Sequence, residues 1–238
     1  MTNQTTLQTG FAQEAFDEFL AARREPAWLT LFRKDAWDAF QEMPLPTRSQ
    51  EEWRRTDLRL FRLDAFSLPS PAEGEPRETK VAGLLEQNVE LAGRTVSLDS
   101  RPIAAQLDPQ WRDHGVYFGS LDAALAQLPE LLKSHFLDPI ADPRADKFAA
   151  LQAACWSGGT LLYVPRGVVI DQPLYSLSAL SPNATDCGRT LVVLDEGAEA
   201  TLLSETASLD PAAAGLHCGA IELRVGPGAR LRYVNLQN

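Results

Sequence analysis

The feature that most constrains the fold is a strand–glycine–strand unit that occurs three times in the last third of the chain. Its glycines, Gly167, Gly197 and Gly228, are 30 and 31 residues apart. Alternating apolar residues flank each glycine: Leu162/Val164, Val192/Leu194 and Leu223/Val225 before it, and Val168/Ile170, Ala198/Ala200 and Ala229/Leu231 after it. Alternation turns one face of each strand inward, and a fixed repeat is typical of stacked coils. The pattern predicts a β-helix with glycines at tight corners, and an antiparallel sandwich is the alternative.

Length and charge limit the possible functions. The chain has 238 residues with 45% hydrophobic content, enough for one large domain or two smaller ones. A formal net charge of -10 argues against nucleic acid or anionic lipid as a partner, because phosphate contacts need clustered Lys and Arg. One basic run is interleaved with acids and predicts a salt-bridged surface. It contains Arg54, Arg55, Arg59 and Arg62 beside Glu51, Glu52 and Asp57.

The N-terminal sequence gives no sign of export. Residues 1–10 have neither the basic start nor the apolar core of a signal peptide. No apolar run approaches the roughly 20 residues that span a bilayer, so we expect no membrane association and a cytoplasmic location. Three cysteines without CxxC spacing argue against a disulfide framework or a structural zinc site.

The chain divides into four expected regions. Residues 1–66 form a helical N-terminal region, 67–80 an exposed linker rich in Pro, Gly and charge, 81–157 a mixed α/β segment, and 158–238 the repeated strands, which look incomplete at the C-terminus. The fold class expected is mainly β, with a helical N-terminal region. The aromatic residues of the first two helices predict a hairpin that packs on its own domain, with docking of a partner as the alternative.

Proline and capping residues set the expected helix limits. The first helix ends before Pro26, where the second begins, and Ser49 has capping-box spacing for a short third helix carrying Trp53. A helix over residues 120–136 is expected to kink or split at Pro129, and another covers residues 146–156. Short strands are expected at residues 89–91, 95–98 and 116–118.

No catalytic signature is present. The GxxxxGK[ST], GxSxG, HExxH and GxGxxG patterns are all absent, so we expect no enzyme activity and assign no catalytic residues. His217 and Cys218 adjoin, but neighbours in a strand point to opposite faces, so we assign no metal site to them. Residues that bind a cofactor cannot be assigned.

The remaining cysteines and histidines have ordinary structural interpretations. Cys155 is expected on the apolar face of a helix. Cys187 lies in a polar turn and is predicted to be the most exposed thiol, with a pKa raised by its neighbour Asp186. His114 is expected at the surface, and His135 as a favourable charge near a helix C-terminus.

Three stretches resemble the SufB/SufD family of iron–sulfur cluster assembly proteins. They are residues 44–58 (PLPTRSQEEWRRTDL), residues 146–174 (DKFAALQAACWSGGTLLYVPRGVVIDQPL), and the glycine corners LDEGAEATL and VGPGARLRYV. The resemblance spans most of residues 11–238. The aromatic hairpin leading into the first stretch is more similar to the SufD branch than to SufB.

The resemblance implies a right-handed parallel β-helix core and a cytosolic scaffold. In this family SufB and SufD pair with each other, and each binds a copy of SufC, an ABC-type ATPase. ATP hydrolysis reshapes the scaffold while a cluster is built from iron and persulfide sulfur. The cluster would therefore be held transiently by the full assembly and not by this chain alone. A nucleotide-binding site on SufC would explain why this chain has no P-loop sequence.

One departure from the family is length. Family members have more coils and a C-terminal helical segment, so we expect this chain to be an N-terminal portion, or to need a partner over its last strand, such as a second copy in a homodimer. The cysteine and histidine positions tied to cluster assembly in the family lie mainly in C-terminal coils, and no residue here matches them.

Two other functions stay open. A β-helical carbohydrate-active enzyme would need a column of acids, but Asp171, Thr201 and Arg232 occupy the matching offsets after the three glycines. A protein-interaction module without metal chemistry would bind a partner but would leave cluster formation unchanged when deleted.

Overall fold

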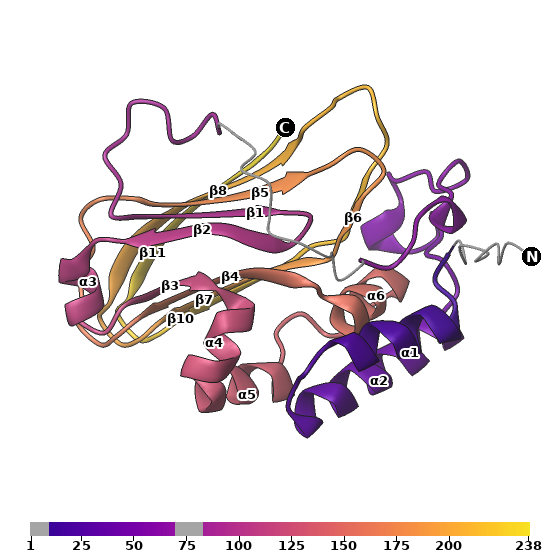
Figure 1. The fold of residues 1–238 in the computed structure, drawn as a ribbon, viewed down its shortest axis with the longest axis horizontal. Coiled ribbons are helices and arrows are strands. Elements are labelled where there is room, and N and C mark those ends of the chain that lie inside the picture. Colours follow the sequence, from indigo (N-terminus) through magenta and orange to yellow (C-terminus); the bar gives the residue numbers. More distant parts are fainter. Residues whose placement is uncertain (1–9, 70–82) are drawn as a thin grey trace, which may run out of the picture.

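The computed structural model describes residues 10–69 and 83–238, which form two facing β-sheets and a layer of helices (Figure 1). The five-stranded sheet has the order β11-β8-β5-β1-β2, and the four-stranded sheet has the order β10-β7-β4-β3. Two short strands, β6 and β9, pair separately. The strands are β1 (Gly93–Leu98), β2 (Arg101–Leu107), β3 (Tyr117–Ser120), β4 (Gly158–Val164), β5 (Leu174–Leu180), β6 (Thr185–Asp186), β7 (Gly188–Leu194), β8 (Glu199–Ser208), β9 (Leu216–His217), β10 (Ala220–Val225) and β11 (Arg230–Gln237).

The helices lie mainly against the outer face of the four-stranded sheet (Figure 1). They are α1 (Gln13–Ala22), α2 (Ala27–Glu42), α3 (Pro109–Asp113), α4 (Leu121–Gln127), α5 (Pro129–Leu137) and α6 (Lys147–Cys155), with single 3₁₀ turns η1 (Glu51–Trp53) and η2 (Leu63–Ala65). Leu121 of α4 and Phe136 of α5 pack with Leu161 and Leu191, which project from the outer face of β4 and β7. No helix among the described residues is both long and apolar enough to cross a membrane.

The glycine repeat places equivalent strands side by side. Strands β4, β7 and β10 pair in parallel, as do β5, β8 and β11. Gly167, Gly197 and Gly228 take φ values of 72°, 69° and 68°, the left-handed conformation that glycine adopts most easily. The apolar residues around them, except the exposed Val225, pack in one cluster between the two sheets. The sequence was therefore a good guide to pairing among these strands.

The predicted fold class, mainly β with a right-handed parallel β-helix core, is wrong. The structure is mixed α/β: the described residues contain six α-helices, and both large sheets combine parallel with antiparallel pairs. Each antiparallel pair, β1–β2 and β3–β4, includes a strand from residues 93–120, which lie outside the repeat. Asp99 and Ser100 link β1 to β2 with φ values of 50° and 69°, as a tight two-residue hairpin requires. The antiparallel sandwich fails as well, because the pairs within the repeat are parallel.

Most helix predictions are confirmed. Helix α2 begins directly after Pro26, and Pro129 separates α4 from α5. Asp146 caps α6, because its carboxylate accepts hydrogen bonds from the backbone NH groups of Phe148 and Ala149. Two details are wrong. The segment after Ser49 is only a 3₁₀ turn without a side-chain cap, and residues 89–91 form no strand.

The N-terminal hairpin packs on its own domain, as favoured from the sequence. Phe16 stacks on Trp37 with ring centroids 4.2 Å apart, and both rings are buried with Leu151 of α6 in one cluster. The hairpin therefore covers α6, which leads directly into β4. Of the predicted linker, residues 70–80 lie outside the described residues.

Candidate functional site

Two hollows meet beside β6 and β9, at the end of the sheets opposite the glycine corners. A cavity of about 260 Å³ lies between the sheets, and an open groove of about 490 Å³ lies between η1, α6 and β9. The same four residues line part of both hollows: His217, Gly219, Ala220 and Ile221. This wall is the candidate functional site.

The cavity between the sheets is lined mainly by polar side chains, many of which carry hydroxyl groups. Ser176 of β5 and Ser204 of β8 are partners in the parallel register, and Asn235 of β11 continues the row. Thr160 of β4 reaches across from the other sheet, with its Oγ1 2.9 Å from Ser176 Oγ. Because strand alternation turns these residues inward, this half of the space between the sheets is polar, and it can hold water or a small polar ligand.

A buried carboxylate orients the histidine of the wall. Asp186 Oδ2 lies 2.7 Å from His217 Nδ1, and the same oxygen accepts a hydrogen bond of 3.0 Å from Ser178 Oγ. Burial alone would raise the pKa of Asp186, but the hydrogen bond and charge of His217, with further hydroxyl donors, hold that pKa below its usual value. The anionic carboxylate therefore fixes the imidazole ring. An added Cβ on Gly219 would lie only 2.5 Å from His217 Nε2, so a side chain at residue 219 would displace the ring.

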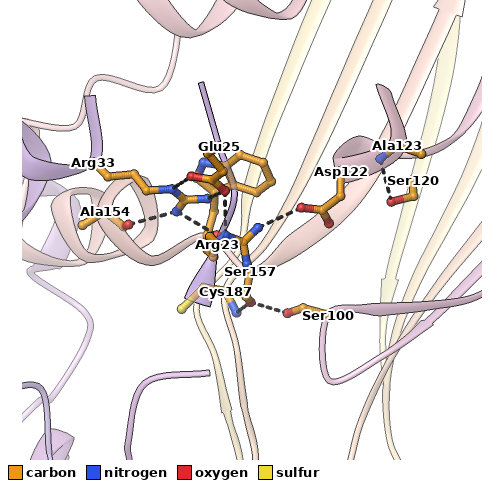
Figure 2. Close-up of polar contacts among 11 residues, drawn as sticks. Arg23, Glu25, Arg33, Ser100, Ser120, Asp122, Ala123, Ala154, Ser157 and Cys187 are labelled. Carbon is orange, nitrogen blue, oxygen red and sulfur yellow. Dashed lines mark hydrogen bonds and ion pairs between the residues drawn. The ribbon is translucent and has the colours of Figure 1, made fainter. Parts of the chain in front are cut away.

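Serine hydroxyls extend this network to a cysteine. Ser100 Oγ donates to Asp186, and Ser157 Oγ donates to Ser100 Oγ at 2.5 Å. Ser157 Oγ in turn accepts a hydrogen bond from the backbone NH of Cys187 at 3.3 Å (Figure 2). The β1–β2 hairpin, the start of β4 and the end of β6 are thereby joined around one carboxylate.

The cysteines at residues 155, 187 and 218 converge in one buried cluster. Burial raises the pKa of Cys155 well above its usual value. The pKa of Cys187 is also raised, first by a hydrogen bond with Cys218 and then by burial. Cys155 and Cys187 are therefore neutral thiols at physiological pH, and neither is an activated nucleophile.

Cys187 is not the exposed thiol that its polar neighbours predicted. Its side chain is fully buried, because the residue lies between α6 and the start of β7 instead of in an open turn. The predicted direction of its pKa shift is correct, but the contribution of Asp186 is smaller than that of Cys218.

His217 and Cys218 diverge, as neighbours in a strand should. The imidazole contacts Asp186, while the Cys218 thiol enters the apolar cluster and donates to the Phe148 carbonyl at 3.5 Å. Within residues 10–69 and 83–238, no group of three or more His, Cys, Asp or Glu side chains is arranged to hold a metal ion.

The other predicted residues lie away from this wall. The basic run is paired at the surface through Arg54–Glu51, Arg59–Asp57 and Arg62–Asp64, as expected. His114 is exposed and contacts the Gln110 carbonyl. His135 lies in the last turn of α5, but burial and Arg224 lower its pKa, which opposes the predicted role as a positive charge.

A second network, which the sequence reading missed, positions α6. Arg33 is fully buried, donates to the Ala154 and Trp156 carbonyls at 3.0 and 2.8 Å, and pairs with Glu25 at 2.7 Å (Figure 2). Arg23 joins Glu25 to Asp122 of α4. These contacts fix the end of α6 where Cys155 lies. The sequence does contain a sign of this network, because Arg33 lies within the apolar stripe of α2, where a buried arginine needs a partner.

Comparison with known proteins identifies the family. Residues 96–175 match the family described as SufBD protein N-terminal region, and residues 178–238 match SUF system FeS cluster assembly, SufBD core domain. Proteins described as iron–sulfur cluster assembly SufBD family proteins in Staphylococcus haemolyticus and Staphylococcus epidermidis are 29% identical over 240 residues, covering 97% of this chain. A Staphylococcus aureus protein of the same description is 28% identical. The chain spans about half the length of these curated relatives, 51% of each. With matches that together cover more than half of its residues, the chain belongs to the SufBD family.

Proposed function

We propose that this chain is a non-enzymatic scaffold subunit for iron–sulfur cluster assembly in the cytoplasm. In this proposal it is of the SufD type, pairs with a SufB-like scaffold, and binds a SufC-like ABC ATPase. The cluster is cargo of the whole assembly. The observation that carries the proposal is the pair of matches to the N-terminal region and the core domain of the SufBD family.

The sheet edges support a role in binding protein. Within the described residues β10 and β11 are edge strands, and apolar side chains on them are exposed. Ile221 and Val225 of β10 are 44% and 45% exposed, and Val234 of β11 is 37% exposed. Unpaired backbone groups beside apolar side chains favour pairing with another chain. The neutral thiols of Cys155 and Cys187 also fit a scaffold better than a thiol-dependent enzyme.

Light-scattering mass measurements test the pairing. We expect the chain to form a complex when mixed with the SufB-like and SufC-like proteins of its own organism. Val225→Lys should weaken that complex at least tenfold, because it places a charge on the proposed contact edge. Leu31→Lys is the matched control, since Leu31 is 63% exposed on α2, away from this edge, and should leave binding unchanged. Absence of any complex with the unaltered chain would contradict the proposal.

A gene deletion separates the scaffold from a simple interaction module. A scaffold predicts that deletion lowers the activity of iron–sulfur enzymes in the cell, and that the intact gene restores it. Partner binding with unchanged iron–sulfur enzyme activity after deletion would favour a module without a role in metal chemistry.

A further inference from the structure

The buried cysteine cluster contains every cysteine of the chain. Cys155, Cys187 and Cys218 are 32 and 31 residues apart, close to the interval of the glycine repeat. That interval stacks equivalent positions on neighbouring strands, so the structure brings the thiols together from three separate elements. None of the three is in a disulfide in this structure.

Cys187 and Cys218 are the pair with the geometry of a crosslink. Strands β6 and β9 pair in parallel, with Thr185 opposite Leu216 and Asp186 opposite His217. The ladder continues through a 2.7 Å hydrogen bond from Cys218 N to the Asp186 carbonyl, so the two cysteines are the next residues in register. Neighbouring strands lie about 4.8 Å apart. That spacing is within the Cα–Cα separation of about 4.4–6.8 Å that a disulfide spans.

The two side chains also point the same way. Both enter the apolar cluster that includes Leu151 and Phe148 of α6. Interaction with the Cys218 side chain is the largest cause of the raised pKa of Cys187, in agreement with this arrangement. Cys155 approaches from the end of α6 and is not part of the β6–β9 pairing.

The groove gives access to one thiol of the pair. Cys218 is 9% exposed and lines the 490 Å³ groove, whereas Cys187 is 0% exposed and lines neither hollow. A small oxidant entering the groove therefore meets Cys218 first, and Cys187 lies behind it.

We propose that Cys187 and Cys218 are a redox pair that closes a reversible disulfide when a hydroperoxide enters the groove. The Cys218 sulfur attacks a peroxide oxygen, the O–O bond breaks, and Cys218 becomes a sulfenic acid with release of water. The Cys187 sulfur then attacks the Cys218 sulfur, and the hydroxyl leaves as water with the Cys187 proton. In total, two thiols and one hydrogen peroxide give one disulfide and two waters. A dithiol reductant reverses the reaction.

The disulfide would change the wall of the groove. It would join the ends of β6 and β9 covalently and remove the Cys218 thiol from the groove, while Cys155 would stay reduced. His217 and Asp186, which adjoin the two cysteines, would be held in the same register.

Peptide mass mapping tests the pair without any variant. Trypsin cuts after Lys147, Arg166, Arg189 and Arg224, so the three cysteines fall in separate peptides of residues 148–166, 167–189 and 190–224. The folded chain is treated with hydrogen peroxide, alkylated under denaturing conditions and digested. We expect the 167–189 and 190–224 peptides to be linked by a disulfide that dithiothreitol breaks, and the 148–166 peptide to be alkylated. Three alkylated cysteines, or a disulfide that includes Cys155, would overturn the proposal.

Variants assign the order of the two steps. Cys155→Ala, the matched control, should form the disulfide as the unaltered chain does. Cys187→Ala should instead accumulate a sulfenic acid at Cys218, which dimedone traps. Dimedone labelling of Cys187 in a Cys218→Ala chain at an equal rate would contradict entry through the groove.

Discussion

At the scale of single residues, burial decides which ion pairs stabilise this fold. Arg33 is fully buried and its partner Glu25 is 6% exposed, whereas the Arg54 and Glu51 side chains are 61% and 75% exposed. Water screens an exposed pair, so its contribution is about 0–1 kcal/mol. Removing one partner of a buried pair leaves an uncompensated charge and costs about 3–5 kcal/mol.

Replacing Arg33 should therefore be strongly destabilising. We expect Arg33→Met to lower the free energy of unfolding by about 3–5 kcal/mol. The change leaves Glu25 paired with Arg23 alone and removes the donors to the Ala154 and Trp156 carbonyls. Urea denaturation followed by tryptophan fluorescence measures the change. Arg54→Met is the control and should stay within about 1 kcal/mol of the unaltered chain. Equal effects of the two substitutions would contradict this account.

The candidate site was only partly predictable from single residues. The sequence indicates His217, Cys218 and Cys187 as candidate residues, and strand alternation correctly predicts that His217 and Cys218 point apart. The contact between His217 and Asp186 was not predicted, because it joins two short strands that are 31 residues apart in sequence. The prediction of an exposed Cys187 was wrong, because the polar residues next to it in the chain do not reveal that α6 packs over its side chain.

At the scale of elements, the glycines divide into two kinds. Gly167 lies at a corner with φ 72°, and an added Cβ there would meet nothing within 4 Å. Gly159 lies in β4 with φ 146°, and an added Cβ would be 1.8 Å from the Arg189 carbonyl oxygen of β7. Residue 167 therefore requires glycine only for its backbone conformation, whereas residue 159 requires glycine also because a side chain would not fit against β7.

Alanine substitution should distinguish the two kinds of glycine. We expect Gly167→Ala to cost about 1–2 kcal/mol, the penalty of the left-handed conformation. Gly159→Ala should cost more than about 3 kcal/mol, because β4 must also move away from β7. Urea denaturation of both variants measures the difference. Gly167→Asn should cost less than Gly167→Ala, since asparagine tolerates this conformation better. A Gly159→Ala cost equal to that of Gly167→Ala would show that the strands accommodate the added methyl.

Element prediction succeeded where the signal was local. Prolines and the Asp146 cap fix helix limits through their own backbone chemistry, so α2, α4, α5 and α6 follow from the sequence. The hairpin between β1 and β2 was missed because Asp99 and Ser100 lack the glycine that usually marks such turns.

At the scale of the whole molecule, the repeat does not determine the β-helix that was predicted from it. It describes how the last three pairs of strands lie next to one another, and this pairing is present. It carries no information about residues 93–120, whose strands add antiparallel edges, or about the helices that cover the four-stranded sheet. Fold class depends on these additions, so a correct local repeat led to the wrong architecture.

The carboxylate of Glu25 links helices α1, α2 and α4 through ion pairs, and its ionisation should make the free energy of unfolding depend on pH. Glu25 faces Arg33 on α2, Arg23 at the end of α1 and, across Arg23, Asp122 on α4. Burial alone would raise the pKa of Glu25, but hydrogen bonds and charges from Arg33 and Arg23 lower it below the usual 4.5. A lowered pKa in the folded state means that the carboxylate stabilises the fold above pH 4.5. This contribution is lost as the pH falls through the lower folded value.

A Glu25→Gln chain should therefore differ from the unaltered chain mainly at neutral pH. At pH 7 the substitution removes the charge that compensates Arg33, so the free energy of unfolding should fall by about 2 kcal/mol or more. Below pH 4.5 the carboxyl group is protonated first in the unfolded chain, so the difference should shrink. The two stabilities converge as the pH falls through the lower pKa of the folded state, where the native carboxyl group becomes neutral like the amide. Urea denaturation of both chains from pH 7 to pH 3.5 measures this difference. If the difference keeps the same size across that range, the stabilising role of Glu25 is steric and not electrostatic.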